Sequence, residues 1–175
     1  MKIFVQDTYK NSNEWSIVLD LANQFHNWMN QTQIQNNFRA MNVPGKGSAD
    51  IEKVITPFAQ TLGFLSQKKH LFKNYSVSSL RPDYHIYFEN LKTGIIIEVE
   101  KGQATQNNNT LKDFWKCHLC DEANYLFLFV PEILVQNVNK TKPDGYPYRE
   151  TIQRFKPFFE RRNYTNVRGV VIYGY

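Results

Sequence analysis

Three carboxylates stand close together in the segment 81–102, whose sequence is RPDYHIYFENLKTGIIIEVEKG. Asp83 follows a proline at the start of one expected strand, and Glu98 and Glu100 lie at the end of a second. Side chains alternate between the two faces of a strand, so Glu98 and Glu100 should point to the same face. If the two strands pair around the glycine-containing turn between them, all three acids meet at one end of a sheet.

A divalent cation would offset the repulsion within such a cluster. Carboxylates that are buried together without a partner cost several kcal/mol. The alternative is that Glu98 and Glu100 lie on a solvated strand face opposite basic side chains, and that Asp83 is a turn acid. The three isoleucines at 95–97 favour a strand that is buried on both faces. The segment therefore predicts a metal site.

The elements that must position these acids follow from hydrophobic periodicity. Apolar residues at helical spacing predict helices at 14–29, 49–62, 110–122 and 149–161, the last interrupted by Pro157. Strands are expected in the two acidic segments and at 71–77, 125–130 and 167–173. The amide-rich segment 31–42 is expected to be a loop or a frayed helix. The order of elements predicts a mixed α/β fold with 125–130 as a buried central strand.

Length and composition predict one globular domain. The chain has 175 residues, of which 42% are hydrophobic and 15% aromatic, enough for a sizeable core. No apolar run approaches the roughly 20 residues of a membrane helix. The first residues, MKIFVQDTYKNSNEW, lack the apolar core of a signal peptide. We therefore expect a cytoplasmic protein.

Two cysteines form the sequence CHLC at 117–120. So few cysteines fit a reducing compartment. Zinc needs about four ligands, and the sequence has no second CxxC pair, although His85 or His26 could complete a site. Two buried thiols on a helix face are the favoured interpretation.

The acidic segment resembles the core of the PD-(D/E)xK nuclease superfamily. Pro82-Asp83 is followed, after a hairpin, by Glu98-x-Glu100, and an acidic helix precedes the hairpin while a helix and a central strand follow it. The resemblance covers residues 48–130. It implies a restriction-endonuclease-like core, a central mixed β-sheet flanked by helices, within a single domain. Residues 1–47 would be a helical N-terminal extension, and 147–175 a C-terminal helix and strand.

The third position of this motif is usually lysine, and here it is Glu100. Some type II restriction endonucleases of the superfamily carry the same E-x-E variant. Lys101 follows directly, but strand alternation turns it to the opposite face unless a bulge intervenes. Lys116, one helix later, is another candidate. Glu100 itself is the favoured one, and the choice among the three stays open.

The resemblance also implies a Mg²⁺ site, in which Mn²⁺ would be a substitute. Mg²⁺ prefers carboxylate and water ligands and usually takes one or two carboxylates from the protein. Asp83 and Glu98 would hold the ion, with the carbonyl of Val99 as a further ligand. Glu100 would orient or deprotonate the attacking water, or bind a second ion. Glu52 would complete the site from the preceding helix, unless it is a solvated acid favoured by the helix dipole.

Basic residues in or beside these elements would bind nucleic-acid phosphates. The candidates are Lys46, Arg81, Lys101, Lys112 and Lys116. The net charge of +5 agrees with an anionic partner, although Lys112 and Lys116 are equally typical of a solvated helix face. The amide-rich loop at 103–109 has side chains suited to base edges.

Together these features predict a small Mg²⁺-dependent DNA endonuclease, most like a type II restriction enzyme or a related defence nuclease. A homodimer acting on double-stranded DNA is expected, because two-fold symmetry matches a palindromic site. One alternative is a structure-specific repair or recombination nuclease, such as a junction resolvase. Another is a non-catalytic nucleic-acid-binding module of the same fold.

Overall fold

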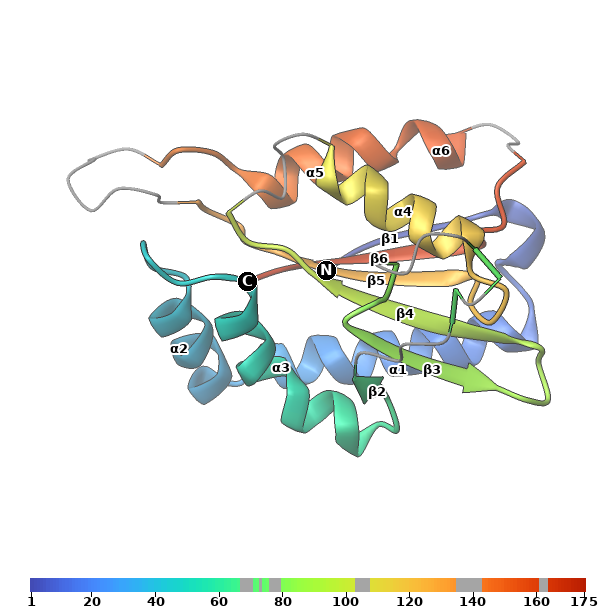
Figure 1. Cartoon of the computed structure of the whole chain (residues 1–175), viewed down its shortest axis with the longest axis horizontal. Helices are drawn as coiled ribbons and strands as arrows, with labels where there is room; N and C mark the ends of the chain where they lie inside the picture. The colour runs from blue at the N-terminus through green and yellow to red at the C-terminus, as the bar shows by residue number, and fades with distance from the viewer. Residues whose placement is uncertain (67–70, 73, 76–79, 103–107, 135–142, 161–163) are drawn as a thin grey trace.

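The computed structural model describes residues 1–66, 71–72, 74–75, 80–102, 108–134, 143–160 and 164–175 (Figure 1). It is an α/β protein with a six-stranded sheet in the order β1-β6-β5-β4-β3-β2. The strands are β1 (Lys2–Val5), β2 (Leu65–Ser66), β3 (Tyr84–Phe88), β4 (Thr93–Val99), β5 (Tyr125–Val130) and β6 (Gly169–Gly174). The helices are α1 (Asn13–Met29), α2 (Thr32–Met41), α3 (Ser48–Thr61), α4 (Asn109–Leu119), α5 (Pro147–Phe155) and α6 (Pro157–Glu160), with a short 3₁₀ helix, η1 (Asp7–Tyr9).

The sheet is mixed. Strands β4, β5 and β6 run parallel to one another, whereas β1, β3 and β2 pair antiparallel with their neighbours. Helices α1, α2 and α3 lie on one face and α4, α5 and α6 on the other (Figure 1). The carboxyl ends of the parallel strands therefore meet at one edge of the sheet, between the two helical layers.

Strand β5 shows why the core has two halves. Its sequence, YLFLFV, is buried at every position because helices cover both faces. Tyr125, Phe127 and Phe129 pack on the side of α1 and α3, and the alternate residues pack on the side of α4 and α5. A continuous apolar run is what a strand buried on both faces requires.

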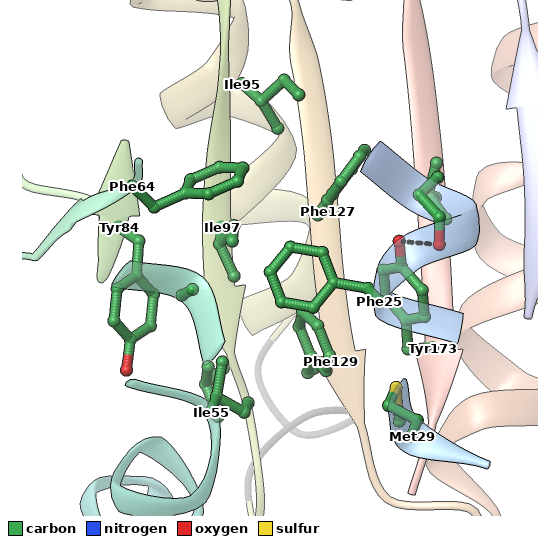
Figure 2. Close-up of a cluster of buried hydrophobic side chains, with 14 of the residues drawn as sticks. Phe25, Met29, Ile55, Phe64, Tyr84, Ile95, Ile97, Phe127, Phe129 and Tyr173 are labelled. Carbon is green, nitrogen blue, oxygen red and sulfur yellow. Dashed lines mark hydrogen bonds between the residues drawn. The ribbon is translucent and has the colours of Figure 1, made fainter. Parts of the chain in front are cut away.

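Phe25 of α1 is the centre of the larger half of the core (Figure 2). Its ring lies 5.3 Å from that of Phe58, 5.7 Å from Phe64 and 5.5 Å from Phe129, in edge-to-face geometry. Aromatic rings prefer such arrangements because their edges are positive and their faces negative. Tyr173 of β6 adds a hydrogen bond from its hydroxyl to the carbonyl of Ala22, at 3.1 Å. These contacts fix α1 against the centre of the sheet.

Most predicted elements are confirmed, with shifts of a few residues at their ends. Strand 125–130 has the predicted bounds, and the helices at 14–29, 49–62 and 110–122 correspond to α1, α3 and α4. The last helix is interrupted as expected, because α5 ends at Phe155 and α6 begins at Pro157. Segment 31–42 is neither a loop nor frayed, since α2 spans most of it.

Three differences concern short segments. The strand predicted at 71–77 is wrong for the described residues there, which form turns and a bend. Leu71 and Phe72 are apolar because they pack into the core on the α4 side. Strands β1 and β2 were not predicted, and both are short edge strands. Within the described ranges, no helix combines the length and apolar character needed to cross a membrane.

Candidate functional site

The β3–β4 hairpin brings Asp83 to the end of β4. Tyr84 pairs with Ile97, so the residue before β3 lies beside the last residues of β4. The backbone N–H of Val99 donates a hydrogen bond to Asp83 Oδ2 at 2.7 Å. This bond fixes the Asp83 carboxylate next to the strand segment that carries Glu98.

The tight packing of this hairpin depends on Gly94. A Cβ atom at Gly94 would lie 2.2 Å from the carbonyl oxygen of Ile86 and 2.4 Å from that of Glu122. Both neighbours are backbone atoms, so only glycine fits the observed register. The register in turn determines which residues of β3 and β4 face each other at the acidic end.

Glu98 is buried and forms an ion pair with Lys116 of α4. The Lys116 Nζ atom lies 2.6 Å from Glu98 Oε2 and 3.2 Å from Asp113 Oδ1. Helix α4 lies over this face because Phe114 and Cys117 pack into the same apolar cluster as Ile96. Its next inward positions, Asp113 and Lys116, then meet Glu98 at the edge of the sheet. The ammonium group thus lies between two buried carboxylates.

The electrostatics of this cluster are dominated by burial. Burial raises the pKa of Glu98 well above its ordinary value, and the charge of Asp113 adds to the effect. Burial also raises the pKa of Asp113. Burial alone would lower the pKa of Lys116, but Glu98 and Asp113 outweigh it and raise that pKa to about 12. Lys116 is therefore charged at neutral pH, and the cluster has more acids than cations.

Two carboxylate oxygens in the cluster are not satisfied. Glu98 Oε1 and Asp113 Oδ2 are buried and have no hydrogen-bond partner in the described part of the chain. Buried acceptors without a donor are rare and costly, and they are often explained by an ion or a water that belongs there. These oxygens lie in the same cluster as the Lys116 ammonium.

Glu100 faces the same helix as Glu98, as strand alternation requires. Burial raises its pKa to about 8, and the interaction with Asp113 contributes. Its backbone N–H donates to the carbonyl of Phe129 at 2.9 Å, which continues the β4–β5 pairing by one residue. Its carbonyl accepts a hydrogen bond from the Tyr175 hydroxyl at 2.7 Å. Glu100 is therefore held at its backbone and titrates near neutral pH.

Lys101 points away from the carboxylates. Its Nζ atom donates hydrogen bonds to the carbonyls of Val43 and Lys46, at 2.6 and 2.7 Å. Lys101 thus anchors the loop between α2 and α3. The lysine that contacts Glu98 is Lys116, one of the three candidates for the third motif position.

Glu52 lies on α3, on the other side of Asp83. Burial raises its pKa, and the charge of Asp83 raises it further. Its backbone carbonyl accepts hydrogen bonds from the hydroxyls of Thr56 and Tyr84, at 2.7 and 3.2 Å. The half-buried Glu52 carboxylate is thus near enough to Asp83 for their charges to interact.

The structure brings together most of the predicted acidic residues and adds Asp113. Asp83, Glu98 and Asp113 interact electrostatically with one another. Sequence reasoning missed Asp113, which is fully buried. Little in the sequence signalled it, because Thr110, a buried α4 position at helical spacing from Asp113, is itself polar.

A divalent cation would have to use a small set of these ligands. In the part of the chain that the structure describes, no group of three or more His, Cys, Asp or Glu residues is arranged to hold a metal ion. Mg²⁺ needs fewer, because it usually binds one or two carboxylates and keeps several waters. Asp83 and Glu98, whose Oε1 atom is unsatisfied, are two such carboxylates, and the backbone of Val99 lies beside Asp83.

Of the remaining basic candidates, Arg81 and Lys112 lie near the cluster, where their charges interact with Asp83 and Glu100. Lys46, Arg81 and Lys112 are exposed, and the carbonyl of Arg81 accepts a hydrogen bond from Lys116 Nζ at 3.4 Å. Cys117 and Cys120 are free, buried thiols, as the sequence predicted. Most of the loop at 103–109 lies outside the described residues.

Comparisons with known proteins give no family for the chain. A scan against protein-family models, a search of curated proteins and a search of solved structures each found no significant match. The resemblance to PD-(D/E)xK nucleases therefore stays a prediction from the acidic segment and the order of the elements around it.

Proposed function

We propose that this protein is a Mg²⁺-dependent DNA endonuclease with a restriction-endonuclease-like core. The observation that carries the proposal is the cluster of Asp83, Glu98 and Lys116. Two strand-end carboxylates and one lysine meet at the edge of a mixed sheet. Phosphodiester hydrolysis needs such a set, because it requires ligands for a cation and a fixed positive charge near the phosphate.

Asp83, Glu98 and the carbonyl of Val99 are the proposed ligands of the cation. When bound, Mg²⁺ would lower the pKa of a water and stabilise negative charge on the transferring phosphoryl group. The Val99 N–H holds the Asp83 carboxylate in one orientation. The ion pair with Lys116 neutralises part of the charge on Glu98. These contacts keep the ligands close to their working positions before a substrate arrives.

Lys116 takes the role of the motif lysine in this proposal. Its ammonium stays protonated at neutral pH, and from beside Glu98 it can donate a hydrogen bond to a phosphate oxygen. Glu100 then has a different task. With a pKa of about 8, it can exchange a proton with water near neutral pH, which is what general acid–base catalysis requires. Glu52 would support the orientation of Asp83 from α3.

The proposed substrate is double-stranded DNA. Exposed Arg81 and Lys112 lie near the cluster, and exposed Lys46 lies on the loop that Lys101 anchors. These three residues would contact phosphates on either side of the cleaved bond. A homodimer would place two such sites on the two strands. We therefore favour a cytoplasmic enzyme of the type II restriction or defence class, and we retain a branched-DNA nuclease as the alternative.

The test is cleavage of supercoiled plasmid in Mg²⁺ and in EDTA. Asp83→Asn and Glu98→Gln should each lower the cleavage rate about 100-fold or more, because the cation would lose a ligand. Glu89→Gln is the matched control, since Glu89 is an exposed acid at the turn of the same hairpin, and it should cleave at the wild-type rate. Wild-type cleavage by both folded cluster variants would refute the proposal. Comparison of branched and linear duplexes would distinguish the two nuclease classes.

A further inference from the structure

A second site lies apart from the carboxylate cluster. A pocket of about 370 Å³ opens where the end of α1 and the helix α2 meet the carboxyl ends of β5 and β6. Its volume is in the range of small-molecule sites. In open α/β sheets, ligands bind outside the carboxyl ends of parallel strands. The described residues that line it include none of the cluster acids.

The inner wall of this pocket is aromatic. Phe38 and Tyr175 stack with their ring centres 5.1 Å apart and their planes 21° apart. Tyr173, which is fully buried, forms the adjacent part of the wall. Flat aromatic surfaces of this kind bind other flat rings by stacking.

Three of the polar side chains of the pocket are amides. Asn30, Gln35 and Asn42 line it, and an amide offers both a donor and an acceptor. The Asn42 amide is already oriented, because its Nδ2 group donates to the carbonyl of Ile133 at 3.1 Å. Its Oδ1 atom is buried and has no hydrogen-bond partner among the residues that the structure describes. Asn42 Oδ1 is therefore an acceptor that an N–H group of a ligand would satisfy.

The charges of the lining side chains balance. Arg39 and Glu132 contribute one charge of each sign. Burial lowers the pKa of His26 and the charge of the Met1 amino group lowers it further, which favours the neutral ring. A phosphate would gain little from such a lining, whereas a neutral, flat ligand with polar edges matches it.

From this combination we infer that the pocket binds a nucleobase. The base ring would stack on the aromatic wall, and an amino or ring N–H group would donate to Asn42 Oδ1. The Tyr175 hydroxyl bonds to the carbonyl of Glu100, so the pocket borders the strand end that carries the proposed cleavage site. The base could belong to a free nucleotide or to an unpaired position of a nucleic-acid strand. Binding itself does not depend on the proposed cleavage.

The test uses the fluorescence of 2-aminopurine, which is quenched by stacking. One arm titrates the protein with 2-aminopurine deoxyribonucleoside monophosphate, and the other with a single-stranded oligonucleotide that carries one 2-aminopurine. Both arms are run in EDTA to separate binding from cleavage. Saturable quenching is expected in at least one arm. Quenching by the free nucleotide indicates a mononucleotide ligand, and quenching by the oligonucleotide alone indicates a base within a strand.

Variants make the result specific to the pocket. Asn42→Leu and Gln35→Ala should each weaken binding roughly two- to tenfold, the effect of losing one hydrogen bond. Asn27→Ala is the matched control, because Asn27 is an exposed amide of α1 that does not line the pocket, and it should bind like wild type. Binding is expected in EDTA whether or not the protein cleaves DNA, which keeps this inference separate from the nuclease proposal. Absence of quenching in both arms, or unchanged binding by both pocket variants, would overturn it.

Discussion

Replacing Lys116 by methionine tests whether this lysine is what stabilises the buried acids. The side chains of Lys116, Glu98 and Asp113 are 10%, 4% and 0% exposed, so solvent screens their interactions little. Removing one partner of a buried ion pair costs about 3–5 kcal/mol. Glu98 can limit this cost by taking up a proton, since burial already raises its pKa. We therefore expect Lys116→Met to lower the free energy of unfolding by about 3 kcal/mol at pH 7.

Urea unfolding followed by tryptophan fluorescence would measure this loss. In the double variant Glu98→Gln/Lys116→Met the two losses should not add, and we expect an interaction energy of about 2–3 kcal/mol. Lowering the pH from 7 to 5 should restore part of the stability of Lys116→Met, because a protonated Glu98 needs no cation. Lys112→Met, on the exposed face of the same helix, should change stability by less than about 0.5 kcal/mol.

Two results would refute this reasoning. One is a loss of less than about 1 kcal/mol for Lys116→Met, which would mean that the ion pair contributes no more than a surface pair does. The other is additivity in the double variant, which would mean that Glu98 and Lys116 do not interact in solution.

Other substitutions test further parts of the structure. Glu100 has a pKa of about 8 in the folded protein and about 4.3 when unfolded. The folded state therefore binds more protons, and the free energy of unfolding should fall as pH rises between these values. Glu100→Gln should flatten this decline in urea unfolding at several pH values, and an unchanged slope would contradict the prediction. Lys101→Met should lower the free energy of unfolding by about 2 kcal/mol, because two carbonyls lose a charged donor. Limited proteolysis should then cut the variant faster than the wild type between α2 and α3, and equal rates would show that Lys101 does not anchor this loop. Gly94→Ala should lower the free energy of unfolding by about 3 kcal/mol or more, since its Cβ would overlap two backbone oxygens. A variant with the same melting temperature as the wild type, measured by circular dichroism, would disprove the close approach.

The elements that sequence predicted well are those whose own residues require burial. Strand β5 is apolar at every position, and α1 repeats apolar residues at helical spacing. Helix α2 was harder because it buries only Phe38 and exposes its amides, so its pattern is weak. Strand β1 depends on a partner at the other end of the chain, with Lys2 opposite Ile172. No local pattern carries that information.

The candidate site was predictable where it followed from strand geometry. Alternation along β4 placed Glu98 and Glu100 on one face and Lys101 on the other, and the contacts of these residues agree. Asp113 was missed because an acidic residue on a helix ordinarily faces solvent. Only the packing of α4 on the sheet shows that Asp113 is buried beside Glu98. Tertiary contacts, not spacing, single out Lys116 as the lysine of the cluster.

The proposed nuclease activity depends on a divalent cation held by Asp83 and Glu98. The most direct measurement is an anomalous difference map from crystals grown with Mn²⁺, for the wild type and for Glu98→Gln. We predict a peak in the wild type between the carboxylates of Asp83 and Glu98 and the carbonyl of Val99, and no peak there in the variant. A wild-type map with no peak at this position, and with Lys116 still bonded to Glu98, would contradict the claim.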